Sequence, residues 1–356
     1  MKTMKQLLNI VIIILVSAFF FGCDEGVYDI DEPGNLLPKT VTEDLRLPRL
    51  EINGKLFHAE TMGNIENPII IFLHGGPGSD YRPMISQKGV ENASRYPEER
   101  TVTNGGISQL QDEYFCVFYD QRGGGLSPRF EPGKLSFDLY VEDLNDIIEY
   151  YLQAKENETG ISDSQVYLFA WSFGGTLATG LINAYPERIK DIVSYEPGPL
   201  SKEVWDYVKD NTTSVLSEIG KEWLEEYLIA HDHFTPDGHE RADYQYMMNV
   251  SQSDKSQPEF HADPNSPYWR AGALLLDDNL DFIDSEDFDI TSNLNSFQGR
   301  FLFIGSENVL NELPEYADMQ MQYYPQSGLI EVSEVGHTGP WEKPDEIALL
   351  IRNYFK

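Results

Sequence analysis

A serine in a tight-turn pattern is the first feature of the sequence that could do chemistry. The run Ala170-Trp171-Ser172-Phe173-Gly174 follows an apolar stretch and opens a helical pattern, which is the setting of a G-x-S-x-G nucleophile elbow. This turn requires small residues two places before and after the serine, and Ala170 and Gly174 are small. The turn lifts the Ser172 hydroxyl out of the chain at a helix N-terminus, where the Phe173 N–H points toward a developing oxyanion. The pattern predicts that Ser172 is a catalytic nucleophile.

A serine hydroxyl at its normal pKa is a poor nucleophile, so Ser172 needs a base. Enzymes built around this kind of elbow place serine, acid and histidine in that order along the chain, so the base should come late. Of the seven histidines, His337 is the one that follows the last strand pattern. His74 ends an early strand pattern and is interpreted as structural, and His58 falls in a hairpin pattern.

A glycine-rich loop is predicted to supply the second donor for the oxyanion. The run His74-Gly75-Gly76-Pro77-Gly78 follows an early apolar stretch, where such elbows take their other backbone N–H. Glycines let the backbone approach a substrate carbonyl closely. We expect the N–H of Gly75 or Gly76 to complete the site with that of Phe173.

The elements that must position these residues alternate between strand and helix patterns. Continuous apolar runs, typical of strands buried on both faces, occur at residues 68–74, 114–119, 165–170, 189–195, 300–304 and 329–335. Helical patterns occur at residues 137–152, 174–185 and 345–354, and a hairpin pattern spans 49–59 around Asn53-Gly54. This alternation predicts an α/β fold with a mostly parallel, twisted sheet flanked by helices.

Residues 198–297 differ in composition from the rest of the chain: they are rich in Trp, Tyr, Asp and His and show no pattern of a buried strand. They are predicted to form a mainly helical cap inserted into a core of residues 45–197 and 298–356. Its end, residues 277–289, holds seven acidic residues and is interpreted as a solvated face, because the loop glycine of a calcium site is missing. His231, His233 and His239 have spacing that suits a metal, but the sequence offers no further ligand. We therefore expect no metal. No phosphate-binding glycine motif occurs in the right context either, so we expect no nucleotide cofactor.

The amino-acid composition indicates which broad class of protein this chain belongs to. The chain has 356 residues, 41% of them hydrophobic, which is enough for a sizeable core and excludes wholesale disorder. The formal net charge of −33 makes binding to nucleic acid unfavourable, because such a surface repels a phosphate backbone. Two cysteines, Cys23 and Cys116, cannot make a disulfide scaffold.

The first 22 residues are predicted to be a signal peptide. Lys2 and Lys5 precede an apolar run at residues 7–21, which is short for a membrane-spanning helix. The run ends Gly22-Cys23, which resembles the lipobox of bacterial lipoproteins, although Phe20 stands where Leu is usual. We expect Cys23 to be lipidated, so that an exported domain is held at the membrane in the periplasm or on the cell surface, with residues 23–44 as a solvated tether. A plain cleaved signal and an uncleaved anchor are the alternatives.

Taken together, the motifs resemble those of one family. The loop HGGPG at residues 74–78, the run DQRGGGLS at 120–127, the elbow and the late Gly-His pair are similar to those of proline iminopeptidases, which belong to the α/β-hydrolase superfamily. The resemblance covers roughly residues 45–200 and 298–356. It implies a serine aminopeptidase that releases N-terminal proline or another small residue through an acyl-enzyme. It implies that Ser172 is the nucleophile and His337 the base, and that Asp120 and Arg122 shape the loops.

The acid of the triad departs from that family pattern. The family places its aspartate in a G-x-x-D pattern, but this chain reads Gly305-Ser306-Glu307-Asn308, and Asn308 cannot balance an imidazolium charge. Glu307 is the expected acid, because its longer side chain can offset a shift of one residue. Glu196, directly after an earlier strand pattern, is the alternative, and a site with another acid or none is a third.

The cap also departs from the family, which holds the substrate amine with glutamates, one of them in a Trp-Glu pair. The nearest place here, Tyr268-Trp269-Arg270, lacks that glutamate, and the sequence does not choose among the other cap acids Glu222, Glu225, Glu226, Asp277 and Asp278. Two alternatives to an aminopeptidase stay open. One is an esterase or amidase acting on small acyl substrates, and the other is a lipid-anchored binding protein without turnover. Dehalogenases and epoxide hydrolases of this fold use an aspartate nucleophile, which Ser172 excludes.

Overall fold

A computed structural model gives the structure of residues 34, 36–87, 105–131, 133–162, 164–212, 239–244, 246–247 and 268–356. The predicted signal peptide, Cys23, His231 and His233 lie outside the described residues, as do Glu222, Glu225 and Glu226. Within the described ranges, every helix is too short or too polar to cross a membrane.

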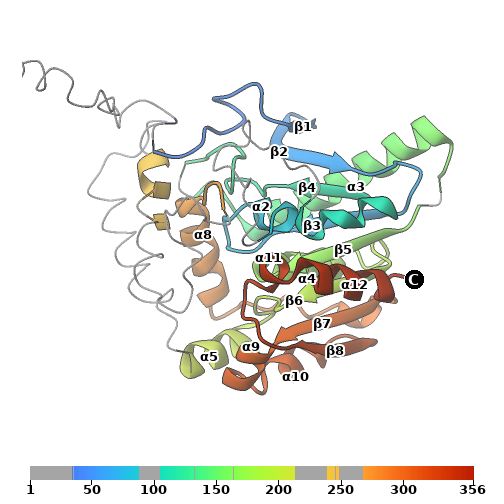
Figure 1. Ribbon diagram of the computed structural model, residues 1–356. Coiled ribbons are helices and arrows are strands. Elements are labelled where there is room, and N and C mark those ends of the chain that lie inside the picture. The colour runs from blue at the N-terminus through green and yellow to red at the C-terminus, as the bar shows by residue number, and fades with distance from the viewer. Residues whose placement is uncertain are drawn as a thin grey trace, which may run out of the picture.

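The centre of the structure is an eight-stranded sheet in the order β1-β2-β4-β3-β5-β6-β7-β8 (Figure 1). The two N-terminal strands form a hairpin that joins the rest antiparallel through the β2–β4 pair, and all later neighbours are parallel. The strands are β1 (Arg49–Ile52), β2 (Lys55–Met62), β3 (Ile69–Leu73), β4 (Phe115–Tyr119), β5 (Val166–Trp171), β6 (Asp191–Tyr195), β7 (Arg300–Ser306) and β8 (Ser327–Val332).

Helices connect the strands from β3 onward. The long helix α3 (Phe137–Thr159) starts at Ser136, whose side chain accepts a hydrogen bond from the Leu139 N–H, and ends at Gly160 with a φ of 75°. Other helices among the described residues include α2 (Arg82–Ile85), α4 (Phe173–Ala184), α5 (Lys202–Asn211), α8 (Ala273–Asp284), α9 (Glu307–Glu312), α10 (Tyr316–Met321), α11 (Gly339–Glu342) and α12 (Pro344–Tyr354), with 3₁₀ turns η2 (Gly106–Asp112) and η4 (Leu294–Ser296).

Alternate residues of each central strand face two different apolar layers. In β3, Ile69 and Ile71 pack in one core with residues of α3 and α4, whereas Ile70 and Phe72 pack in the other with residues of η2 and α12. Because both faces of the sheet are covered, the strands read as continuous apolar runs in the sequence. The predicted α/β fold with a mostly parallel sheet flanked by helices is confirmed.

The hairpin and all six predicted core strands are present, but the bounds of the last strand differ from those predicted. The last strand spans Ser327–Val332 rather than 329–335, and the chain after it forms the loop that carries His337. In Figure 1, α5 and α8, from the segment predicted as a cap, lie at the end of the sheet away from the C-terminus.

The expectation of a solvated tether through residue 44 is wrong for its later part. The Glu240 carboxylate accepts hydrogen bonds from the backbone N–H groups of Gly34, Leu36 and Leu37, at 2.7–2.8 Å. The side chains of Leu37 and Val41 are buried, and the Val41 N–H donates to the Leu126 carbonyl. This segment packs on the protein because Leu37 and Val41 remove apolar surface from water.

Candidate active site

Ser172 occupies a strained turn between a strand and a helix. It separates Trp171, the last residue of β5, from Phe173, the first residue of α4, and its φ of 55° and ψ of −124° are unusual for a residue with a Cβ. Hydrogen bonds fix the turn: the Ser172 N–H donates to the Tyr195 carbonyl, and its own carbonyl accepts from the N–H groups of Gly175 and Gly198. The half-buried side chain therefore leaves the chain at a held angle.

His337 lies against a buried carboxylate. Its Nδ1 is 2.5 Å from Oε2 of Glu196, whose side chain is only 2% exposed, whereas the His337 side chain is 33% exposed. The other oxygen of Glu196 accepts a hydrogen bond from the Ser306 N–H at 2.8 Å, so both carboxylate oxygens are engaged. This contact to Nδ1 leaves Nε2 of the ring for a proton from another group.

His337 and the elbow belong to one cluster of residues. The Trp171 indole N–H donates to the His337 carbonyl at 2.8 Å, and the centroids of the Trp171 and His337 rings are 5.9 Å apart. Trp171 precedes Ser172 in the chain, so the base candidate sits beside the strand end that carries the nucleophile candidate.

The predicted oxyanion loop also meets the elbow. A Cβ added to Gly75 would lie 2.8 Å from Cβ and 3.4 Å from Oγ of Ser172, so this loop touches the serine side chain. Gly76 follows in the same loop with a φ of 123°. As the first residue of α4, Phe173 carries a backbone N–H that has no acceptor within its helix. Gly75 and Phe173 therefore lie next to the serine, and Gly76 follows Gly75 in the loop.

A comparison with known protein families identifies the family of this fold. The profile of the alpha/beta hydrolase fold family matches residues 68–286, which is more than half of the chain. The chain belongs to this family. In this fold the nucleophile elbow stands between a strand and the next helix, and Ser172 stands between β5 and α4, with Glu196 and His337 later in the chain.

Curated relatives of this alpha/beta hydrolase include two peptidases. A probable aminopeptidase, YbaC of Bacillus subtilis, is 27% identical over 126 residues, 35% of this chain and 32% of the relative. The proline iminopeptidase of Thermoplasma volcanium is 25% identical over 197 residues, 54% of this chain and 56% of the relative. The matches thus span between a third and just over half of these relatives.

Solved structures that resemble this hydrolase have other named activities. A thermophilic esterase from Thermogutta terrifontis aligns with a TM-score of 0.57 at 15% identity, covering 86% of this chain and 98% of the esterase. An epoxide hydrolase from Bacillus megaterium aligns with a TM-score of 0.56 at 17% identity, covering 86% of this chain and 99% of that enzyme. At these identities the likeness shows the fold alone.

The expectation that Glu307 contacts the His337 ring is wrong in this structure. Glu307 is the first residue of α9, and its carboxylate accepts a hydrogen bond from the Glu334 N–H at 3.0 Å instead. The helix starts immediately after β7, which points Glu307 toward the backbone of the neighbouring loop. Glu196, the alternative, reaches the imidazole because its φ of 42° turns the chain sharply after β6.

His74 shapes the glycine loop through its contacts with Gly75 and Gln121. Its Nδ1 donates to the Gly75 carbonyl, and its Nε2 accepts from the Gln121 N–H at 2.9 Å. Complete burial lowers the pKa of His74 and keeps the imidazole neutral. One ring nitrogen can therefore donate a hydrogen bond while the other accepts one. The structural interpretation of His74 agrees with this geometry.

Asp120 shapes the loops around the site, and sequence reasoning missed its partner. The buried carboxylate lies 2.7 Å from Nδ1 of His58 and accepts hydrogen bonds from the N–H groups of Tyr81 and Leu126. The hairpin pattern gave no sign that His58 would be buried against this loop. Arg122, the other loop residue, forms two hydrogen bonds with the Asp143 carboxylate of α3.

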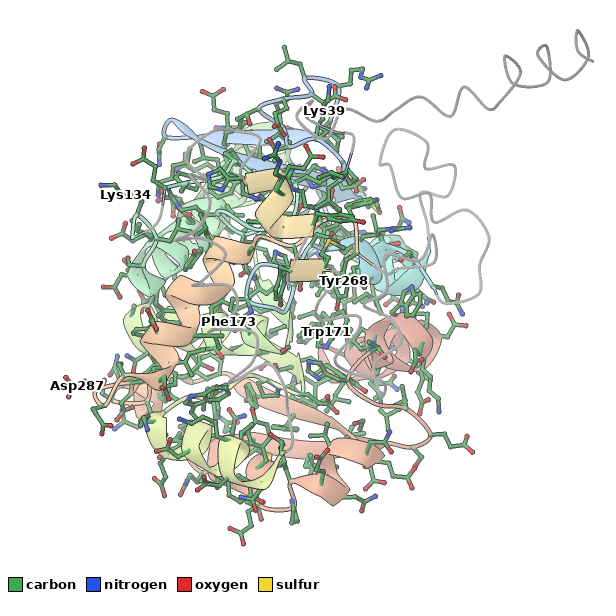
Figure 2. All side chains as sticks on the ribbon, turned by 90° about the vertical axis from the view of Figure 1, so that its left-hand side faces the viewer. Lys39, Lys134, Trp171, Phe173, Tyr268 and Asp287 are labelled. Carbon is green, nitrogen blue, oxygen red and sulfur yellow. The ribbon has the colours of Figure 1, made fainter. Side chains whose placement is uncertain are left out.

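The segment predicted as a cap contributes Tyr268, whose ring stacks on Trp171 with centroids 6.4 Å apart (Figure 2). The following backbone is held by Asp80, which accepts hydrogen bonds from the N–H groups of Trp269 and Arg270. Asp277 and Asp278 belong to α8, but their side chains are not among those described. Among the residues with described positions, no group of His, Cys, Asp and Glu side chains could hold a metal ion.

Proposed function

We propose that this alpha/beta hydrolase is a serine hydrolase in which Ser172, His337 and Glu196 form the catalytic triad. The observation that carries the proposal is the 2.5 Å contact between His337 Nδ1 and the buried Glu196 carboxylate, beside a strained elbow serine. A buried carboxylate on Nδ1 fixes the ring tautomer and stabilises the imidazolium that forms during the reaction.

The proposed chemistry proceeds in two halves. Ser172 Oγ attacks the substrate carbonyl carbon as its proton moves to His337 Nε2, and the oxyanion is held by the N–H groups of Phe173 and of Gly75 or Gly76. Collapse of this intermediate breaks the scissile bond, and His337 gives its proton to the leaving group. Water then attacks the acyl-enzyme with His337 again as base, which releases the acid and frees Ser172.

An aminopeptidase that releases N-terminal proline or another small residue is the favoured substrate class. Its support is the HGGPG and DQRG motifs together with the two relatives named as aminopeptidase and proline iminopeptidase. An esterase or amidase is the second candidate, because the Trp-Glu pair is missing at Trp269. The idea of a non-catalytic binding protein rested on Asn308, and a carboxylate from Glu196 removes that reason.

A substrate screen tests these readings. Proline and alanine arylamides are compared with aryl esters of short acids, at equal concentration and with purified protein. Cleavage of the proline and alanine arylamides is expected. Cleavage of esters alone would favour the esterase, and turnover of neither class would contradict the serine hydrolase proposal.

Gly75→Ala tests the loop beside the nucleophile. The added Cβ lies 2.8 Å from Ser172 Cβ, which is closer than such atoms pack, so the loop or the serine must move. We expect the rate of Ser172 labelling by a fluorophosphonate to fall by about 10²-fold, the size of effect that a misplacement of about 1 Å causes. Gly328→Ala is the matched control, because its Cβ would meet only Leu302 at 3.9 Å. Equal labelling rates in both variants would contradict a role for this loop.

We propose that the protein is exported and held at the membrane, in the periplasm or on the cell surface, through lipid on Cys23. The support is the sequence alone: two lysines, an apolar run and Gly22-Cys23. Several acyl chains are needed for stable anchoring. The native protein should partition into the detergent phase of a cell extract, and Cys23→Ser should not. Equal partitioning of both proteins would point to an uncleaved anchor.

A further inference from the structure

The loop that carries His337 is tied to the ends of two strands by aromatic side chains. Trp171 and Tyr195 are register partners at the ends of β5 and β6. The Trp171 indole N–H donates to the His337 carbonyl at 2.8 Å, and the Tyr195 hydroxyl donates to the Gly336 carbonyl at 2.6 Å. Two consecutive carbonyls of one loop are therefore held from two neighbouring strands.

The side chains of these two donors are buried, whereas Gly336 and His337 are half-buried. Trp171 is 2% exposed and Tyr195 fully buried, and both pack in the apolar layer that contains Val335. Burial, together with the neighbouring Glu196, raises the pKa of Tyr195, so its hydroxyl stays a donor. A side chain on Gly339 would collide with the Tyr195 hydroxyl, which shows how closely the loop approaches the ring.

The positions of the two aromatics in the chain connect the loop to the other members of the proposed triad. Trp171 directly precedes Ser172, and Tyr195 directly precedes Glu196. The Ser172 N–H also donates to the Tyr195 carbonyl, which joins the two strand ends. His337 itself lies between β8 and α11, outside any strand or helix, so the two side-chain hydrogen bonds add to the Gly339 N–H to Gly336 carbonyl bond in holding its loop.

We propose that Trp171 and Tyr195 are positioning residues that hold the His337 imidazole in register with Glu196 and Ser172. The inference rests on the proposed serine hydrolase function and deepens it. Trp171 also stacks on Tyr268, from the segment predicted as a cap (Figure 2), and the centroid of the His337 ring lies 5.9 Å from that of the same indole.

The test removes each donor. Tyr195→Phe deletes only the hydroxyl, whereas Trp171→Phe replaces the buried indole with a smaller ring and so removes some packing together with the N–H. We expect each change to lower kcat by about 10- to 100-fold, because the imidazole is displaced by a fraction of an ångström, and to leave KM within about threefold. The ring ¹⁵N chemical shifts of His337, assigned with His337→Gln, should also change, because the Nδ1 contact with Glu196 loosens.

Matched controls separate positioning from general stability. Trp205→Phe removes an indole N–H that donates to Asp284 at the surface, and Tyr324→Phe removes a buried hydroxyl that bonds to Thr179. Both controls should keep kcat and the His337 shifts, even where the melting temperature falls. The proposal is overturned if the controls lower kcat as much as the test variants do, or if the His337 shifts stay unchanged in both test variants.

The nuclear magnetic resonance measurement does not depend on turnover. If the native protein cleaves no substrate, the serine hydrolase proposal fails, while the His337 shifts still decide whether the two aromatics position the ring. If Trp171→Phe does not fold, Tyr195→Phe decides the question, because it acts on the same loop and loses one oxygen atom only.

Discussion

Replacing Ser172 by alanine is expected to lower turnover by about 10⁶-fold, the loss that follows removal of a triad nucleophile. The change deletes only Oγ from a half-buried side chain. The backbone bonds that hold the turn, from the Ser172 N–H to Tyr195 and to its carbonyl from Gly175 and Gly198, are all retained. We therefore expect the melting temperature to stay close to that of the native protein while kcat falls to the background rate.

The matched control is Ser292→Ala, since Ser292 bonds weakly to Asn183 at 3.5 Å on the exposed surface. This variant should keep full activity. Labelling by a fluorophosphonate should be lost in Ser172→Ala and retained in the control. If Ser172→Ala keeps even a tenth of the native turnover, Ser172 is not the nucleophile.

Sequence patterns predicted the core of the fold because its strands are buried on both faces. Ile69–Leu73 and Phe115–Tyr119 are continuous apolar runs, and continuous runs of this length in an alternating chain are typical of a parallel sheet. The elbow was equally visible, because the requirement for small residues at 170 and 174 is local. Features fixed by near neighbours in the chain were therefore predictable.

The acid was misplaced because its position depends on contacts between distant segments. The sequence pattern after β7 pointed to Glu307, one residue from the usual site, and chain order favoured it. The structure starts α9 at that residue, which engages Glu307 with the Glu334 backbone. The signal for Glu196 was present in Tyr195-Glu196-Pro197 at a strand end, but its φ of 42° and its bond to Ser306 are not readable from sequence.

The position of the segment before β1 also depends on contacts with residues that are distant in the chain. Its acids, prolines and glycine indicated a solvated chain, and local composition gives no hint of a partner about 200 residues away. Three backbone N–H groups of this segment converge on the Glu240 carboxylate, and Arg270 donates to the Pro38 carbonyl. Buried backbone groups must find partners, and here a cap glutamate supplies them.

Glu196→Gln is expected to lower kcat by about 10⁴-fold, as loss of a triad carboxylate does elsewhere. The amide has nearly the same shape, so it can still meet the Ser306 N–H and His337 Nδ1. It has no charge to stabilise the imidazolium, and its NH₂ group can hold the ring in the wrong tautomer. The measurement is kcat on the best substrate of the screen, with the melting temperature as a check on folding.

Glu307→Gln provides the decisive comparison, because both glutamates follow strands of the same sheet and only Glu196 touches the ring. This variant should keep kcat within about threefold of the native value, since an exposed hydrogen bond to a backbone N–H contributes about 1 kcal/mol to stability and nothing to the base. A large loss of kcat in Glu307→Gln with activity retained in Glu196→Gln would mean that Glu307, after β7, is the triad acid. Losses below about tenfold in both variants would mean that Ser172 and His337 act as a dyad, with Glu196 serving only to hold the ring in place.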